Sequence, residues 1–188
     1  MSEVQRKSVG YPGGLAARYR WGGSGSAEDV FGLSEAGGDL TDHAALAGGD
    51  PARMCRAELR VEGPLGDWTA RLASPVFDEP SGLAWDTAGQ LVIKYGFVVY
   101  AFIGRTGELA WSHLSGTPVV TVLGSPRIDH VIVQSEVETV ALDAAGEVRW
   151  RVAQSDVVAS AELLGGTLTV TSYGGEVVAL DPASGASA

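Results

Sequence analysis

The sequence predicts an all-β protein built from repeated antiparallel sheets. Beyond residue 51, runs of three to seven residues rich in β-branched side chains are separated by Gly, Asp and Pro, which is typical of strands joined by turns. No stretch in this region keeps the 3.6-residue period of an amphipathic helix. A glycine and a tryptophan recur at a spacing of 39 residues, and such a fixed spacing indicates a repeat architecture.

Residues 1–50 have a different composition, and we expect them to be a glycine-rich, acidic and mostly disordered segment. Glycine pairs recur in it, and from Glu28 to Asp50 there are six acidic residues and no basic one. Such a segment buries too little apolar surface to offset the entropy lost on ordering. A short helix around Leu40 to Ala47 is the one element expected here. The sequence therefore predicts a boundary near residue 51, followed by a β-repeat domain over 51–188.

The strands of this domain follow from local patterns. Polar and apolar residues alternate from Arg56 to Glu62, which in a strand places Ala57, Leu59 and Val61 on one face. Short apolar runs predict seven further strands, which are Leu91 to Ile93, Phe97 to Ile103, Val119 to Leu123, Val131 to Val133, Val137 to Leu142, Leu168 to Thr171 and Val177 to Leu180.

Three segments of the chain align as copies of one unit. They are YAFIGRTGELAW (100–111), VALDAAGEVRW (140–150) and VALDPASGASA (178–188). All three copies share a glycine, which is Gly107, Gly146 or Gly185. The first two copies share a tryptophan (Trp111 and Trp150), and the last two share an aspartate (Asp143 and Asp181). We expect the glycines to adopt positive φ in a turn and the aspartates to accept backbone N–H bonds there. Each tryptophan offers a large apolar area for docking one sheet on the next.

The pattern AxDxxxGxxxW resembles the repeat of quinoprotein-like (PQQ-like) β-propellers, and the resemblance covers about residues 85–188. It implies antiparallel blades that stack on one another, but no particular function, because such blades serve enzymes, assembly factors and regulatory scaffolds. Three clear copies are fewer than the roughly six to eight blades of family propellers, so we expect an incomplete or small propeller. The segment GDWTARL (66–72) resembles GEVRWRV (146–152) and suggests a strand that completes the last sheet. An open arc and a ring assembled from two chains are the alternatives.

No catalytic or cofactor site is expected. Cys55 has no histidine near it in the sequence, and His43, His113 and His130 show no metal-ligand spacing. Glu136 and Glu138 share one strand face, which is typical of a solvated edge. The family's quinone-dependent enzymes often carry a vicinal disulfide, which one cysteine excludes, and three blades cannot enclose the cofactor.

The charge disfavours nucleic acid as a partner. The net charge is −10, and since residues 1–21 carry +3, the rest carries −13. The first residues lack the apolar core of a secretory signal, and no run of eighteen apolar residues exists to span a membrane. The lone cysteine fits a reducing compartment, so the expected location is the cytoplasm.

These observations favour a non-catalytic scaffold that presents loops at one rim to a protein partner. A docking element in the N-terminal segment, rich in aromatic and arginine side chains, would assist it; its residues are Tyr11, Arg18, Tyr19, Arg20 and Trp21. The alternatives are a small-molecule or carbohydrate sensor, a hydrolase using Glu136, Glu138 and either His113 or His130, and a remnant of a larger propeller. A homo-oligomer that completes a ring is a further expectation.

Overall fold

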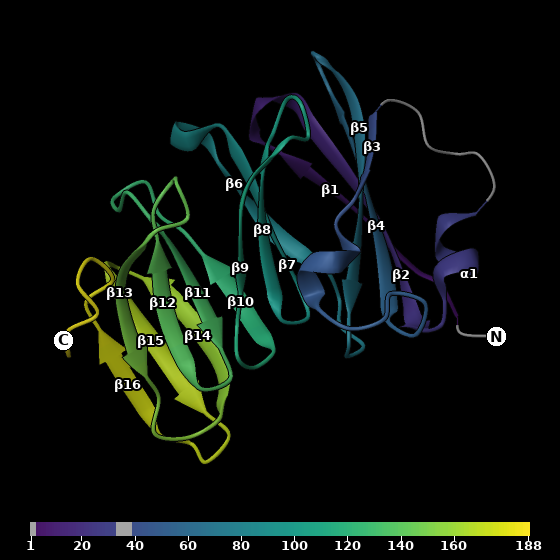
Figure 1. Ribbon diagram of the computed structural model, residues 1–188. Coiled ribbons are helices and arrows are strands. Elements are labelled where there is room, and N and C mark those ends of the chain that lie inside the picture. The colour runs from purple at the N-terminus through teal and green to yellow at the C-terminus, as the bar shows by residue number, and fades with distance from the viewer. Residues whose placement is uncertain (1–2, 33–38) are drawn as a thin grey trace. The chain divides into compact units, whose positions relative to one another are not determined.

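The structure is a computed structural model, which describes residues 3–32 and 39–188 of the chain. The described residues form four β-sheets, and the chain divides into two compact units, 1–114 and 115–188 (Figure 1). Each unit contains two of the sheets. The prediction of an all-β protein is therefore confirmed.

The first sheet of unit 1 combines both sides of the predicted boundary at residue 51. Its strand order is β1-β2-β4-β5-β3, and every neighbouring pair is antiparallel except β3 and β5. The strands are β1 (Gln5–Tyr11), β2 (Leu15–Ser24), β3 (Asp39–Asp42), β4 (Cys55–Gly63) and β5 (Gly66–Ser74). The short helices between them are η1 (Pro12–Gly14), α1 (Ala27–Phe31) and η2 (Ala44–Ala47).

Residues 1–50 were expected to be mostly disordered, but the structure places β1, β2, α1, β3 and η2 among them. The strands are stabilised by contacts that lie far away in the sequence. β2 pairs along β4, and alternate β2 residues such as Tyr19 and Trp21 enter the core of unit 1. Composition alone does not reveal such a partner. The helix expected around Leu40 to Ala47 forms only in its second half, as η2, whereas β3 occupies the first half and pairs with β5. The side chain of Asp42 accepts the Ala44 N–H at the start of η2.

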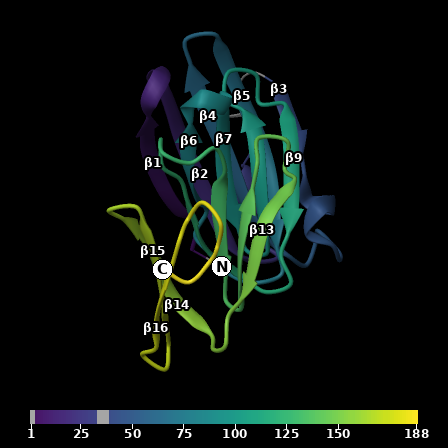
Figure 2. The ribbon, with the colours of Figure 1, turned by 90° about the vertical axis from the view of Figure 1, so that its left-hand side faces the viewer.

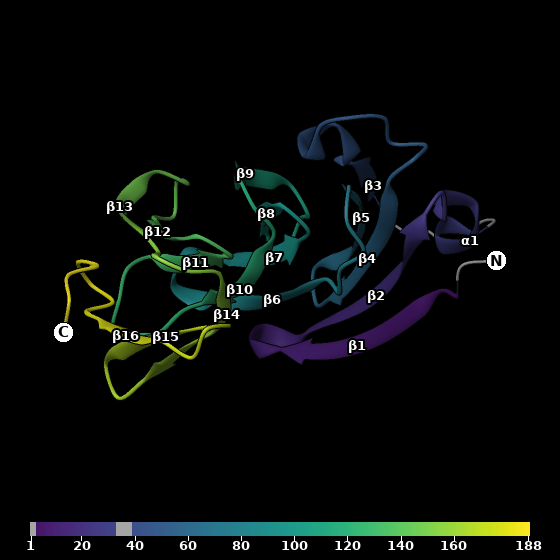
Figure 3. The same ribbon diagram turned by 90° about the horizontal axis from the view of Figure 1, so that it is seen from below.

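The second sheet of unit 1 is a simple meander that packs against the first. It has the order β6-β7-β8-β9, with η3 (Asp86–Ala88) in its first turn. Leu59 and Leu72 of the first sheet share a fully buried core with Ile93 and Phe102 of the second, and Figure 3 shows the two sheets side by side. The strands are β6 (Ser81–Trp85), β7 (Gln90–Tyr95), β8 (Val98–Ile103) and β9 (Leu109–Leu114).

Unit 2 contains one meander of four strands and one of three, and the second of these is seen in Figure 2. The first has the order β10-β11-β12-β13, and the second β14-β15-β16. Ile132 from the first and Leu168 from the second are buried in a common core. The strands are β10 (Val119–Leu123), β11 (Val131–Ser135), β12 (Glu138–Leu142), β13 (Val148–Ala153), β14 (Val158–Leu164), β15 (Thr167–Ser172) and β16 (Val177–Leu180).

Each strand predicted beyond residue 51 is present, and the repeat is visible in the pairing register. Trp111 of β9 lies opposite Ala101, and Trp150 of β13 lies opposite Ala141, and in both sheets the register shifts just after this alanine. The two tryptophans therefore occupy the same place in successive sheets. Within residues 3–32 and 39–188, no helix has the length and apolar character needed to cross a membrane.

The suggestion that Gly66 to Leu72 completes the last sheet is wrong. This segment belongs to β5, whose two edges are taken by β4 and β3. β16 pairs with β15, and beyond it Leu180 forms an isolated antiparallel bridge with Ser187. The likeness between GDWTARL and GEVRWRV instead marks the same position in different sheets, because β5 and β13 are both tryptophan-bearing fourth strands.

A tryptophan of one sheet covers the glycine turn of the next sheet. Gly107, Gly146 and Gly185 have φ angles of 74°, 82° and 72°, as predicted. A Cβ on Gly107 would lie 2.5 Å from the ring of Trp68, and one on Gly185 would lie 2.6 Å from the ring of Trp150. Glycine is required at both positions because of the left-handed backbone and because the ring lies against it. The expected aspartate bonds are also present, since Asp143 Oδ1 accepts from the N–H groups of Ala145 and Glu147, and Asp181 Oδ1 from that of Ala183.

The variants Gly107→Ala and Gly185→Ala are each expected to lower the free energy of unfolding by about 2–4 kcal/mol, since a Cβ adds backbone strain and displaces a tryptophan ring. Urea denaturation followed by tryptophan fluorescence measures this. Gly116→Ala is the matched control, because no atom lies within 4 Å of its added Cβ. Glycine variants as stable as this control would contradict the packing described.

Candidate interaction surface

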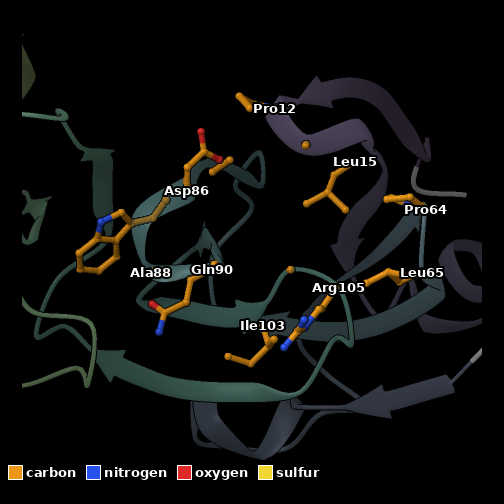
Figure 4. A pocket seen from close by; sticks show the side chains of 14 residues that line it. Pro12, Leu15, Pro64, Leu65, Asp86, Ala88, Gln90, Ile103 and Arg105 are labelled. Atoms are coloured by element: carbon orange, nitrogen blue, oxygen red, sulfur yellow. The ribbon is translucent and has the colours of Figure 1, made fainter.

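Four turns of unit 1 come together at one end of its two sheets. In an antiparallel meander the first and third turns lie at the same end, so the β1–β2, β4–β5, β6–β7 and β8–β9 turns meet there. They line a groove of about 440 Å³, which we call the rim groove (Figure 4). The labelled side chains in Figure 4 surround this space from all four turns.

The rim groove is mainly apolar and has a charge of each sign on its border. Its apolar side chains come from both sheets, and Leu65 at the tip of the β4–β5 turn is 72% exposed. Asp86 and Arg105 supply the charges. An apolar centre bordered by polar groups is the usual arrangement of a protein–protein interface. The apolar residues that line the groove are Pro12, Leu15, Pro64, Leu65, Ala84, Trp85, Ala88 and Ile103.

The floor of the rim groove is held by hydrogen bonds between the two sheets and within the turns. Trp68 Nε1 donates to the carbonyl oxygen of Gly104 at 2.8 Å, and the Gly104 N–H donates to the carbonyl of Gly89 at 2.9 Å. Trp111 Nε1 donates to Gln90 Oε1 at 3.2 Å. A surface held in this way loses little entropy when a partner binds.

The expected N-terminal docking element is not a mobile, exposed segment. Tyr19 and Trp21 are 1% and 6% exposed and belong to the core of unit 1, and the hydroxyl of Tyr11 lies 2.7 Å from that of Tyr19. Arg18 and Arg20 point to the opposite face of β2, where Arg18 pairs with Glu62 at 3.2 Å. Alternation along one strand therefore separates the aromatic residues from the arginines.

His130 and Glu138, two of the residues considered for a hydrolase, are not brought together. Val131 pairs with Leu142 and Gln134 with Thr139, so His130 and Glu138 lie at opposite ends of the β11–β12 pair, roughly 16 Å apart. His130 is 4% exposed and its Nε2 donates to the carbonyl of Pro182 at 2.7 Å. Glu138 pairs with Arg151 at 3.2 Å. Both side chains thus have structural partners.

No group of three or more His, Cys, Asp or Glu side chains that could hold a metal ion occurs in the described part of the chain. Asp78 and Glu79 are separate partners of lysines rather than one ligand cluster. Asp78 accepts from Lys94 Nζ at 2.8 Å and from the Gly96 N–H at 2.7 Å, whereas Glu79 accepts from Lys7 Nζ at 2.6 Å.

Comparisons with known proteins find similarity in sequence and in structure. A family model described as the outer membrane protein assembly factor BamB, named PQQ_2, matches residues 95–188, which are half of the chain. No curated protein sequence matches the chain.

Among solved structures, BamB from Moraxella catarrhalis has a TM-score of 0.52 and 17% identity, over 98% of this chain and 49% of that one. The WD40 domain of Toxoplasma gondii coronin has a TM-score of 0.50 and 11% identity, over 94% and 50%. Dihydro-heme d1 dehydrogenase NirN in complex with DHE has a TM-score of 0.50 and 16% identity, over 96% and 45%. The fold is therefore of the β-propeller type, and the chain spans about half the length of these proteins.

Cys55 is expected to be unreactive in the folded protein. Its side chain is 4% exposed in the core of unit 1, and burial raises the pKa of the thiol, so little thiolate forms near neutral pH. Labelling with a chromogenic disulfide reagent at pH 8 should be at least about a hundredfold slower in the native state than in denaturant, because it requires opening of the core. Equal rates in the two states would show that the thiol is accessible and available as a nucleophile.

Proposed function

The chain belongs to the PQQ-like repeat family of the outer membrane protein assembly factor BamB, and we propose that it is a non-catalytic scaffold that binds a protein partner in the rim groove. The observation that carries this proposal is the apolar lining of the groove, exposed on a floor fixed by hydrogen bonds. The β-propeller-type fold by itself leaves the function open, since the similar solved structures include both BamB and the dehydrogenase NirN.

The non-catalytic part of the proposal is supported by the roles of the reactive side chains. Cys55 is buried, His130 is bound to a backbone carbonyl, and Glu138 is paired with Arg151. None of these three borders the rim groove, where the titratable side chains are Asp86 and Arg105. Arginine stays protonated near neutral pH, so these two charged side chains suit orientation of a partner better than proton transfer between them.

A protein surface is a better occupant for the rim groove than a small molecule. A small-molecule site encloses most of its ligand, whereas this groove is bordered by exposed residues, including Pro12, Leu65, Asp86 and Arg105. A partner side chain or turn could seat on the apolar centre and leave the charged border in water. The sensor for a small molecule or carbohydrate stays an untested alternative, as does the remnant of a larger propeller.

The variant Leu65→Asp is expected to weaken partner binding strongly, because it replaces an exposed apolar side chain at the edge of the rim groove with a charge. The partner would be identified by photo-crosslinking from a reactive amino acid at position 65 in the native host, followed by mass spectrometry. Affinity of the identified protein for purified variants would then be measured, with a loss of at least about 2 kcal/mol expected for Leu65→Asp.

Leu164→Asp is the matched control, because Leu164 is 70% exposed next to a hairpin turn, as Leu65 is at 72%, but lies in unit 2. It should bind the partner with wild-type affinity. The proposal fails if both variants bind equally well, or if position 65 gives the same diffuse set of adducts as position 164.

Two further expectations stay predictions. The 188-residue chain has a mass of 19.4 kDa. If a homo-oligomer completes a ring, light scattering should give a mass at least twice this value. The cytoplasmic location can be checked by fractionation of the native host.

A further inference from the structure

The β8–β9 turn, which lines the rim groove, has the same hydrogen bonds as the turn that follows β16. The Gly107 N–H donates to the carbonyl of Ile103 at 2.8 Å, and the Gly185 N–H donates to that of Asp181 at 2.8 Å. In each turn a threonine or serine hydroxyl also accepts the N–H of the residue two positions further on, at 3.3 and 3.4 Å. The two turns are therefore copies that can be compared position by position.

Two side chains of the β8–β9 turn differ from this copy in a way that its backbone does not require. Asp181 accepts the Ala183 N–H at 2.9 Å and the Ser184 hydroxyl at 2.9 Å. Ile103 stands at the position of Asp181, and Arg105 stands at that of Ala183. Ile103 cannot accept these bonds, and yet the backbone of its turn is the same. Both Ile103 and Arg105 line the rim groove, so we attribute the two differences to the groove.

The two charges of the rim groove are not used within the molecule. Asp86 and Arg105 are exposed, and neither side chain has a hydrogen bond or an ion pair with the residues that the structure describes. In unit 2, by contrast, the exposed Asp129 pairs with Arg149 at 3.1 Å. Figure 4 shows Asp86 and Arg105 on opposite sides of the groove. The groove thus offers a partner one anionic border and one cationic border.

The backbone fixes the positions of these two borders relative to each other. Gly89 lies three residues after Asp86, and its carbonyl accepts the N–H of Gly104, next to Arg105, at 2.9 Å. Trp68 Nε1 holds the same glycine from below, since it donates to the Gly104 carbonyl at 2.8 Å. Because the charged turns are bonded to each other, they suit a partner whose own charges have a defined order and spacing.

We propose, on the basis of the proposed function, that the rim groove binds an extended partner segment in which an apolar side chain stands between an acidic and a basic residue. The acidic residue would pair with Arg105, whose guanidinium suits a carboxylate. The basic residue would pair with Asp86, where the neighbouring Trp85 also lines the groove and its ring favours a cation. A nucleic acid is a poorer occupant, because Asp86 would repel its phosphates.

The test begins with random peptides of about seven residues, which span roughly 23 Å when extended, displayed on phage and selected on the full-length protein. The wild type should enrich sequences that carry an acidic, an apolar and a basic residue in one order. Arg105→Glu should enrich a basic residue in place of the acidic one, and Asp86→Lys an acidic residue in place of the basic one, because each variant reverses the charge of one border.

A fluorescein-labelled peptide with the sequence selected by the wild type then measures affinity by anisotropy. Arg105→Ala is expected to weaken its binding about tenfold. The matched control is the double variant Arg105→Ala, Ala183→Arg, which moves the arginine to the copy of the turn in unit 2 and keeps the net charge. It should bind as weakly as Arg105→Ala. Ile103→Asp should also weaken binding about tenfold. It should keep the urea midpoint of unfolding, because it restores the aspartate that the copy has.

Two results would overturn this inference and leave the proposed function standing. The first is a set of peptides whose binding is lost in Leu65→Asp but unchanged in Arg105→Glu and Asp86→Lys. The second is wild-type affinity of the double variant, which would mean that the peptide responds to the total charge alone. If no selected peptide loses binding in Leu65→Asp, the rim groove is not a peptide-binding site, and the proposed function fails together with this inference.

Discussion

The packing of a tryptophan ring on a glycine turn is the contact on which the stacking of the sheets depends. Trp68 covers Gly107 between the two sheets of unit 1, and Trp150 covers Gly185 between the two sheets of unit 2. The contact fixes both the spacing of neighbouring sheets and the position of their turns, because the ring admits no side chain at the glycine. In unit 1 the same ring also donates to Gly104, so one residue joins the core to the floor of the rim groove.

The fold could be predicted wherever the turns and strands of a sheet are marked by residues that are close together in the sequence. Gly107, Gly146 and Gly185 mark equivalent turns, and Asp143 and Asp181 form the bonds that such turns require. The strands of the first sheet that precede residue 51 could not be predicted, because α1, β3 and η2 lie between β2 and its partner β4 in the sequence. Their order depends on pairing with β4 and on the arginine–phenylalanine contacts of α1, and both involve residues far away in the sequence.

The candidate sites were beyond prediction for the same reason. The rim groove is lined by four turns between residues 12 and 105, and Leu65 appears in the sequence only as one apolar residue between Pro64 and Gly66. Neighbours across strands depend on register in the same way, since Arg6 and Arg20 lie side by side only once β1 is folded back on β2. Basic residues near the N-terminus were noticeable, but their separation from Tyr19 and Trp21 is a property of the folded strand.

The rim groove is lined by turn residues and by the ends of strands, whereas the core of unit 1 is made of residues from within the strands. The lining of the groove can therefore change without loss of the contacts that keep the protein folded. Substitutions at Leu65, Asp86 or Arg105 would change the chemistry of the rim groove, while the packing of Trp68 on Gly107 would stay the same. A lineage of such proteins could diverge widely in its partners and still keep the same glycines and tryptophans.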